Sequence, residues 1–221
     1  MTNLTIADQA TPPCFDHMFQ TRLEMLIAWR RDVRRFSERP IPAALVEHLF
    51  DLAQFSPSVG NSQPWRWVRV ESLEKRAAIR ANFVASNASA QRAQPNERAR
   101  AYASLKLEGM DRAPLQLAVF CDRTTRQGLG LGCHTMRETL EYSVAAMVST
   151  FWLAARAAGL GVGWVSIFDP VEVGRILDVP LYWKMVAYLC IGWPAEEHLD
   201  PELERHGWQS RTEAGRQVRI V

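Results

Sequence analysis

The sequence has few of the features that mark several common protein classes. Its four cysteines, Cys14, Cys121, Cys133 and Cys190, show no C-x-x-C spacing, and its five histidines follow no metal-ligand pattern. We therefore predict buried free thiols in a reducing compartment and no metal site. No apolar run approaches the roughly 18 residues of a membrane span, and the first twenty residues lack a basic-then-apolar signal pattern. The expected location is the cytoplasm, without membrane contact.

The signatures of several ligand-binding and catalytic classes are also missing. A net charge of only +2 predicts no general attraction to nucleic acid. There is no Walker loop, and Ser166 has no G-x-S-x-G context. A dinucleotide-binding motif requires G-x-G-x-x-G between a strand and a following helix, but 128–132 reads only G-x-G-x-G, and 159–163 follows a helix and precedes a strand. We interpret the first as a flexible loop and the second as the end of a helix.

The residues that are present indicate one globular domain over residues 1–221. Apolar residues make up 48% of the chain, which includes eight tryptophans. Hydrophobic spacing predicts helices at 16–31 and 42–55, a helix opening at Ser72, a long apolar helix at 136–158, and strands at 65–70, 115–121, 164–168 and 185–191. Helices and strands that interleave in this way predict an α+β fold, with a small sheet flanked by helices and a long central helix.

Three segments stand outside this pattern. We predict that residues 1–16 form an irregular N-terminal arm, because Pro12 and Pro13 exclude helix. Residues 86–113 are polar and weakly periodic, which is typical of either a functional lid or a plain surface excursion. Residues 195–221 form a polar C-terminal extension.

The first helix leads into an unusual concentration of arginine. Leu23, Leu26 and Ile27 follow helical spacing and predict a core-facing stripe. Four of the next residues in 30–35 are arginines, and Asp32 lies among them. The planar fork of arginine binds phosphate through paired hydrogen bonds. A solvated helix end, with Asp32 in an ordinary ion pair to Arg31 or Arg35, remains the alternative.

Two other segments offer complementary chemistry. The loop 56–65 carries amide and hydroxyl groups that can address the edge of a heterocycle, and 159–166 offers glycine backbone and Ser166 to a flat ligand. Together with the arginines, these segments predict a site for a phosphorylated planar ligand.

These motifs, R-R-x-x-R-x-F at 30–36, S-P-S-x-x-N-x-Q-P-W at 56–65 and G-L-G-x-G-W at 159–164, resemble the FMN-dependent nitroreductase superfamily over about residues 16–211. The resemblance implies a nitroreductase-like fold, a small mixed or antiparallel sheet, and an intertwined homodimer with FMN at the interface, to which the helix 136–158 is a candidate contributor. The implied FMN-binding residues are Arg30, Arg31, Arg34, Trp164 and Val165 of one subunit, and Pro57, Ser58, Asn61 and Gln63 of the other. Arg211 is our choice for a further phosphate contact, with Arg205 as the alternative.

One departure from the usual pattern points to a particular branch. Nitroreductases usually carry serine where this chain has Asp32. Asp32, Trp164-Val165-Ser166 and the long segment 86–113 are similar to the branch that consumes reduced FMN and dioxygen. Its members release erythrose 4-phosphate and 5,6-dimethylbenzimidazole, the lower ligand of vitamin B12.

That branch implies catalytic roles for Asp32 and Ser166. Asp32 would act as a base toward the flavin if the flanking arginines keep it ionised, and Ser166 would donate a hydrogen bond at the reactive edge. Residues 86–113 would form a lid, and a separate flavin reductase would supply reduced FMN. Two alternatives remain: an NAD(P)H-dependent nitroreductase or dehalogenase, and an FMN carrier without catalysis.

Overall fold

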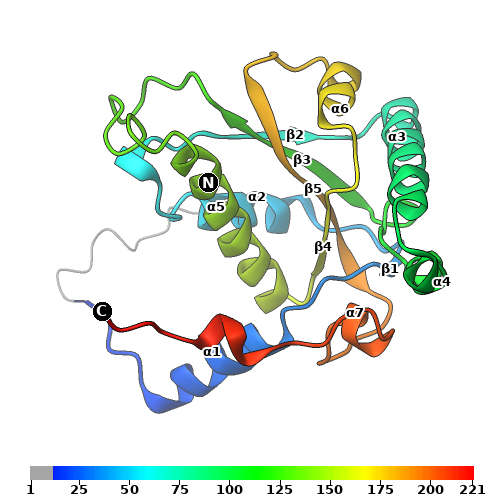
Figure 1. The fold of residues 1–221 in the computed structure, drawn as a ribbon. Helices are drawn as coiled ribbons and strands as arrows, with labels where there is room; N and C mark the ends of the chain where they lie inside the picture. The colour runs from blue at the N-terminus through cyan, green and yellow to red at the C-terminus, as the bar shows by residue number, and fades with distance from the viewer. Residues whose placement is uncertain (1–11) are drawn as a thin grey trace.

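The computed structural model describes residues 12–221, apart from the side chains at positions 96 and 97. The elements follow in the order α1 (His17–Trp29), β1 (Phe36–Ser37), α2 (Ala43–Ala53), the 3-10 helix η2 (Val59–Asn61), β2 (Trp65–Arg69), α3 (Leu73–Arg92), α4 (Asn96–Ser104), β3 (Leu115–Asp122), α5 (Thr139–Ala157), β4 (Gly161–Val165), α6 (Pro170–Leu177), β5 (Trp183–Pro194), α7 (Glu202–Arg205) and the 3-10 helix η3 (Glu213–Arg216) (Figure 1). This mixture of helices around one sheet confirms the predicted α+β class.

The sheet is built around β5. Leu189 of β5 pairs with Leu117 of β3 and with Trp164 of β4, so these two strands lie on opposite sides of β5. β2 pairs with the free edge of β3, and β1 pairs with the end of β5. All of these ladders are antiparallel, while an isolated bridge between Asp32 and Val162 is parallel. Of the two predicted possibilities, a small mixed or a small antiparallel sheet, the structure shows the antiparallel one.

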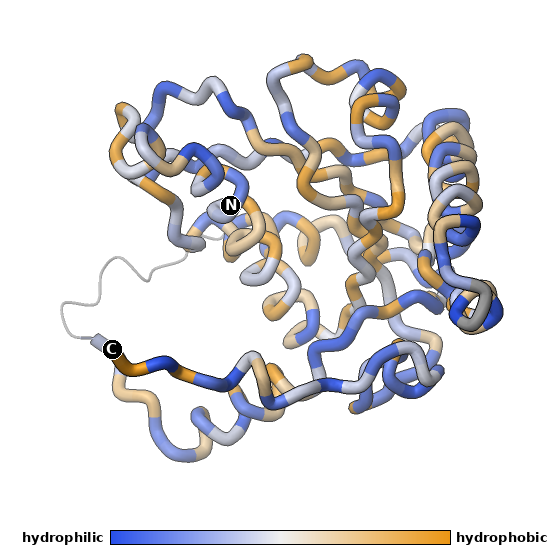
Figure 2. Tube along the Cα trace, viewed as in Figure 1, coloured by the Kyte–Doolittle hydropathy of each residue, from blue (hydrophilic) through white to orange (hydrophobic). Residues whose placement is uncertain are grey.

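Helices cover both faces of the sheet. Alternate residues of a strand point to opposite faces, and in β3 Leu117 and Val119 pack in the cluster that contains α2 and α5, whereas Ala118 and Phe120 pack in the cluster that contains α3 and α6. β3, at the centre of the sheet, is accordingly buried at every residue, and much of the trace through the middle of the molecule has the colours of hydrophobic residues (Figure 2). The predicted long central helix is α5, which buries eight of its residues within its own chain.

Short polar residues begin three of these helices, two of them at the predicted starts, Asp16 and Ser72. Asp16 accepts a hydrogen bond from the Phe19 N–H at the start of α1. Ser72 caps α3 in the same way, and Asp169 caps α6, whose first residue is Pro170. Each cap satisfies a backbone N–H that has no partner inside the helix.

The predicted strand 164–168 is displaced in the structure, where β4 spans Gly161–Val165. The reason is a close approach by the chain that follows α1. A Cβ at Gly161 would lie 2.7 Å from Val33 Cγ2, and a Cβ at Gly163 would lie 2.3 Å from the Val33 carbonyl oxygen. These glycines therefore admit Val33 to the strand edge, rather than only ending the preceding helix.

The helix α1 forms as predicted, but the prediction that its apolar stripe faces the core of the same chain is wrong. None of its residues is buried, and Leu23 and Ile27 remain 40% and 54% exposed. Its main neighbour within the chain is α5, and it lies along the edge of the molecule beneath that helix (Figure 1). Its apolar side chains are therefore open to a partner.

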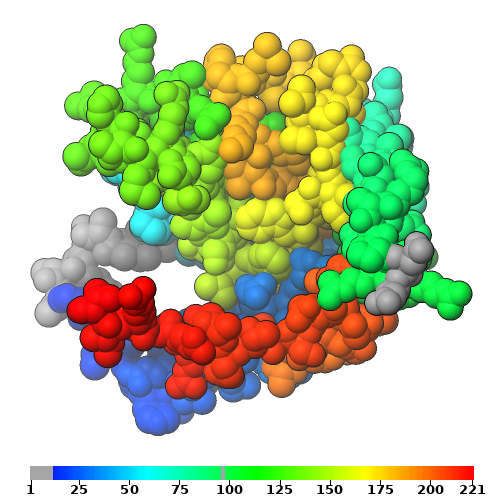
Figure 3. Space-filling model, viewed as in Figure 1, coloured from blue at the N-terminus to red at the C-terminus, as the bar shows by residue number. Residues whose placement is uncertain are grey.

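Two of the three terminal or weakly periodic segments, 86–113 and the C-terminal extension, contain helices. Residues 12–16 of the N-terminal arm are non-helical, and the rest of the arm lies outside the described residues. Residues 86–113 include the end of α3 and all of α4. The C-terminal extension crosses the lower edge of the molecule (Figure 3) and packs its Trp208 ring 5.8 Å from that of Tyr102 on α4.

All four cysteines are free. Cys121 and Cys190 are buried as predicted, but the prediction is wrong for Cys14, which is exposed before α1, and for Cys133, which is half-buried in the turns before α5. Within residues 12–221, no helix is long and apolar enough to cross a membrane. Over the same range, no three His, Cys, Asp or Glu side chains are grouped to hold a metal ion.

Candidate functional site

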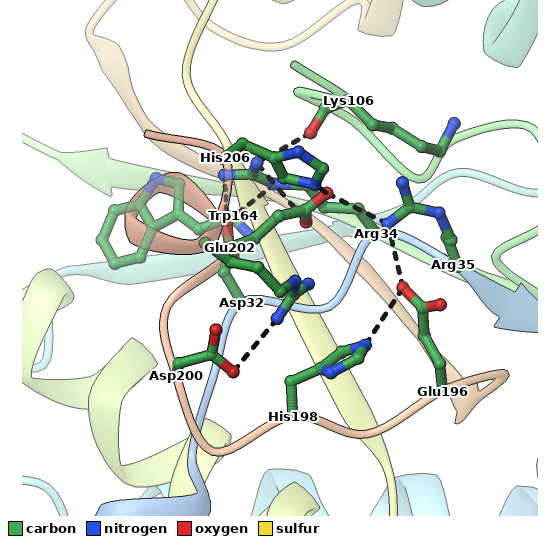
Figure 4. A network of polar contacts seen from close by, with 11 residues as sticks. Asp32, Arg34, Arg35, Lys106, Trp164, Glu196, His198, Asp200, Glu202 and His206 are labelled. Carbon is green, nitrogen blue, oxygen red and sulfur yellow. Dashed lines mark hydrogen bonds and ion pairs between the residues drawn. The ribbon is translucent and has the colours of Figure 1, made fainter. Parts of the chain in front are cut away.

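Asp32 lies at the meeting point of the arginine segment and β4. The Val33 N–H donates to the Val162 carbonyl at 3.0 Å, which holds this segment along the strand. Asp32 Oδ1 then accepts from the Trp164 N–H at 2.8 Å. Asp32 Oδ2 accepts from Arg34 Nε and Nη2 at 3.3 and 3.0 Å (Figure 4). The expected ion pair therefore forms with Arg34, and not with Arg31 or Arg35.

Burial dominates the electrostatics of Asp32. It raises the pKa of this carboxyl above the ordinary value, while the Arg34 charge and the Trp164 hydrogen bond act in the opposite direction. The flanking arginines thus do not outweigh desolvation. A carboxyl whose pKa moves toward neutrality is better matched to proton transfer than an ordinary aspartate.

Arg34 is bonded on three sides within the chain. Besides Asp32, its Nη1 donates to the Lys106 carbonyl at 2.7 Å and lies 3.6 Å from Glu202 Oε2. Its side chain is 9% exposed. Arg34 therefore ties together the arginine segment, the base of segment 86–113 and the C-terminal extension, and much of its donor capacity is used inside the protein.

Arg30, Arg31 and Arg211 form a cationic cluster beside this network. The Arg30 guanidinium stacks over the Trp152 ring at 4.7 Å, and Arg31 Nε donates to the Leu199 carbonyl at 2.6 Å. Burial, then the charges of Arg211 and Arg30, lower the pKa of Arg31, against weaker effects from acidic neighbours.

The two C-terminal candidates for a phosphate contact, Arg205 and Arg211, differ in their ion pairs. Arg205 pairs with Asp200 at 3.3 Å, whereas neither Arg30 nor Arg211 has an ion pair to a carboxylate in the described part of the chain. Converging cations that lack carboxylate partners are suited to a phosphate group. Both C-terminal arginines lie near Arg31, since Arg205 lines the same pocket and the Arg211 charge lowers the Arg31 pKa, but only Arg205 is paired with a carboxylate among the described residues.

Ser166 lies just past the end of β4 and is exposed. It follows by two residues Trp164, whose N–H is bonded to Asp32. Its Oγ makes no hydrogen bond to any described residue, so the hydroxyl is available to a ligand. Val165, between Trp164 and Ser166, is buried in the core on the α3 and α6 side.

The loop 56–65 is held in an uncommon conformation. Asn61 and Gln63 have positive φ angles of 54° and 42°, which cost non-glycine residues energy and are concentrated at functional sites. Ser58 Oγ accepts from the Gln63 N–H at 3.1 Å, and the Val59 N–H donates to Ser143 Oγ at 3.0 Å. Pro57 and Asn61 are exposed.

Within one chain, this loop and the arginine segment stay apart. The loop contacts α5 at Ser143, while Arg30 contacts it at Trp152. Nine residues of helix separate these contacts, roughly 14 Å along the axis. No hydrogen bond or ion pair between residues 12–221 joins the two segments. The structure thus assembles Asp32, the arginines and Trp164 in one place, and presents Pro57, Ser58, Asn61 and Gln63 elsewhere.

Sequence reasoning missed the acidic side of the site. Glu196 and Glu202 contact Arg35 at 3.0 Å each, and Glu202 also faces Arg34. The signal was available as charge complementarity, since five acids lie between positions 196 and 204. It could not be assigned to particular arginines without the fold.

The chain shows extensive similarity to known proteins. The nitroreductase family model matches residues 27–193. The chain is 59% identical over 201 residues to the 5,6-dimethylbenzimidazole synthase of Rhodospirillum rubrum, covering 91% of this chain and 95% of that one. It is 48% identical over 195 residues to a protein of the same name from Rhodobacter capsulatus, covering 88% and 94%.

Solved structures share the fold. Iodotyrosine deiodinase bound to FMN and 3-iodo-L-tyrosine superimposes with a TM-score of 0.67 at 23% identity, covering 80% of this chain and 91% of the other. A putative NAD(P)H:FMN oxidoreductase from Staphylococcus epidermidis gives a TM-score of 0.65 at 17% identity, covering 96% and 99%. The match over three quarters of the sequence and the shared fold lead to one conclusion: the chain belongs to the nitroreductase family.

Proposed function

We propose that the chain is a 5,6-dimethylbenzimidazole synthase, which uses dioxygen to fragment reduced FMN into 5,6-dimethylbenzimidazole and erythrose 4-phosphate. The observation that carries the proposal is the 59% identity, over nearly the full length of both chains, to the protein of that name from Rhodospirillum rubrum. The half-buried Asp32, where other nitroreductases usually carry serine, is consistent with a specialised reaction.

The residues present fit FMN. The cluster of Arg30, Arg31 and Arg211 has the charge and the N–H donors for a phosphate group. Burial, and after it the charges of Arg211 and Arg30, lower the pKa of Arg31, and a bound anion would relieve the repulsion between these cations. We assign the phosphate to this cluster. Arg34 and the backbone near Trp164 and Val165 would contact the rest of the molecule.

When bound, reduced FMN supplies the electrons for dioxygen and the carbon atoms of the product. Asp32 is suited to accept a proton at Oδ1, because that oxygen receives only the Trp164 N–H while Oδ2 receives two bonds from Arg34. Ser166 offers an uncommitted hydroxyl as a hydrogen-bond donor. The segment 86–113, anchored through Lys106, would exclude water from these groups.

The proposed assembly is a homodimer in which the loop 56–65 of one subunit completes the site of the other. Two observations support it: the loop and the arginine segment do not meet within one chain, and α1 exposes apolar side chains that need cover. The exposed members of this surface are Phe15, Met18, Phe19, Leu23, Met25, Ile27 and Trp29. Burying such a surface favours association.

Two further assignments follow from the chemistry. A separate flavin reductase would supply reduced FMN, because the lid would cover the flavin face where a nicotinamide docks. The cytoplasm is the proposed location, since free thiols such as Cys121 and Cys190 persist in a reducing compartment.

The decisive experiment is to reduce FMN on the protein without oxygen, admit air, and identify the small molecules by mass spectrometry. We expect 5,6-dimethylbenzimidazole from the natural sequence, and a large loss of product from Asp32→Asn, which keeps the shape and removes the base. Intact FMN with hydrogen peroxide would overturn the proposal. Steady NAD(P)H oxidation with a nitroaromatic acceptor would then indicate a nitroreductase, and its absence an FMN carrier.

A further inference from the structure

A buried carboxylate from the C-terminal extension lies behind the catalytic network. Glu202, the first residue of α7, has a side chain only 6% exposed. Its Oε1 accepts from Arg35 Nη1 at 3.0 Å and lies 3.7 Å from His206 Nε2. Its Oε2 lies 3.6 Å from Arg34 Nη1. Burying a charge is costly unless it is paired, so the position of Glu202 depends on these two arginines.

Arg34 stands between two carboxylates (Figure 4). Its Nε and Nη2 face Asp32, and its Nη1 faces Glu202 and the Lys106 carbonyl. A guanidinium has a single positive charge to share between neighbouring anions, and its planar fork makes the two contacts geometrically dependent. A change at Glu202 must therefore alter what Arg34 offers to Asp32.

We propose that Glu202 is a positioning residue for Asp32, because it fixes the orientation of Arg34 and limits how strongly this guanidinium favours the ionised form of Asp32. The inference rests on the proposed function, in which Asp32 transfers a proton. Glu202 itself contacts neither Asp32 nor the phosphate cluster, and acts only through Arg34.

Other charged and polar groups lie close to Asp32 and Glu202. On the side of Asp32 these are the Arg30 charge, the Trp164 N–H and the buried Cys190 thiol. On the side of Glu202 they are Arg35 and His206, and through Arg35 also Glu196 with its neighbour His198. The control must therefore change a charge in this second group without touching Arg34.

Glu196 provides that control. It accepts from the same Arg35 Nη1 at 3.0 Å, but it has no ion pair with Arg34 among the described residues. Glu202→Gln and Glu196→Gln each remove one negative charge from the network at nearly constant shape. Only the first removes a charge that faces Arg34.

The primary readout is the titration of Asp32, followed by NMR of aspartate labelled with carbon-13 in the carboxyl group. The intact protein is used without FMN, and Asp32→Asn assigns the signal. We expect Glu202→Gln to lower the Asp32 pKa by up to about one unit, because one nearby charge typically produces shifts of this order. Glu196→Gln should leave it unchanged. The same titration in both variants and the natural sequence would overturn the inference, as would equal shifts in both variants.

A second variant separates positioning from a general structural role. Glu202→Asp keeps the charge but shortens its reach, so it should hold the Asp32 titration nearer to the natural value than Glu202→Gln does. Equal displacement by both variants would count against the inference. If Glu202→Gln does not fold, Glu202→Asp should still displace the Asp32 titration through the altered orientation of Arg34, and an unchanged titration would overturn the inference. The pH profile of product formation should move to lower pH in Glu202→Gln. If the natural sequence forms no product, the proposed function fails, while the titration still decides the role of Glu202.

Discussion

Gly163→Ala should damage the site and the fold together. The added Cβ would lie 2.3 Å from the Val33 carbonyl oxygen, which is far inside van der Waals contact. The oxygen belongs to the backbone, and the Val33 N–H is already bonded to Val162 at 3.0 Å. The segment containing Asp32 must therefore move away from β4 as a unit.

The size of the effect follows from the contacts that this movement breaks. Overpacking a tight interior costs about 1–3 kcal/mol. Weakening the hydrogen bond between Asp32 and the Trp164 N–H adds about 1.5–3 kcal/mol if it is lost entirely. The two contributions together come to roughly 2.5–6 kcal/mol, which corresponds to a fall in Tm of about 5–24 °C for a domain of this size. Product formation should fall with it, because Asp32 loses its fixed position.

Gly161→Ala is the informative companion. Its Cβ would meet only the Val33 side chain, at 2.7–2.9 Å from Cγ2, Cβ and Cγ1. Val33→Ala removes two of these three atoms, so it should partly rescue Gly161→Ala but not Gly163→Ala. Gly174→Ala in α6 is the control: its Cβ meets Val179 at an ordinary 3.5 Å, so it should be neutral or slightly stabilising. Thermal unfolding monitored by circular dichroism measures all of these. An unchanged Tm for Gly163→Ala, or equal rescue of both variants, would refute the reasoning.

Three other predictions concern charge and assembly. Burial raises the pKa of Asp32, so the folded chain binds this proton more tightly than the unfolded chain, and the carboxyl costs stability as pH rises above its ordinary range. The free energy of unfolding of Asp32→Asn, measured with urea, should therefore rise relative to that of the natural sequence as the pH goes from acidic to neutral. A difference between the two proteins that is the same at every pH would contradict this. Arg211→Ala should weaken FMN binding by roughly 10–100-fold, because a charged hydrogen bond of about 1.5–3 kcal/mol is lost. Binding of riboflavin, which lacks the phosphate, should not change. If titration calorimetry shows that both ligands lose the same affinity, Arg211 does not belong to the phosphate site. Ile27→Glu should produce monomers in analytical ultracentrifugation, and a dimer that withstands it would exclude α1 from the interface.

Local chemistry explains why much of the fold could be predicted from the sequence. Ser72, Asp169 and Pro170 begin helices by capping rules that depend only on neighbouring residues. The alternation of inward-facing residues in β3 and the length of α5 follow from hydrophobic spacing. The clustering of arginine with Asp32 was also visible, and the structure places both beside Trp164.

What could not be predicted depends on contacts distant in the chain. The glycines at 161 and 163 looked like a helix end because their partner, Val33, lies far away in the sequence. The partner of Asp32 is Arg34, which is oriented by Lys106 and Glu202 from two other segments. The apolar stripe of α1 shows the same limit, because spacing shows that a helix has an apolar face but not which molecule covers it.

The separation of the two motifs along α5 has a genetic consequence if the proposed dimer holds. A subunit with Asp32→Asn keeps an intact loop 56–65, and a subunit with a disabling substitution at Asn61 keeps an intact arginine segment. A mixed dimer of the two would contain one site built entirely from intact parts and one with both defects. Two inactive variants should therefore complement each other when expressed together, and random pairing would restore about one quarter of the sites, as expected for a symmetric dimer. Two defects placed in the same motif would never complement.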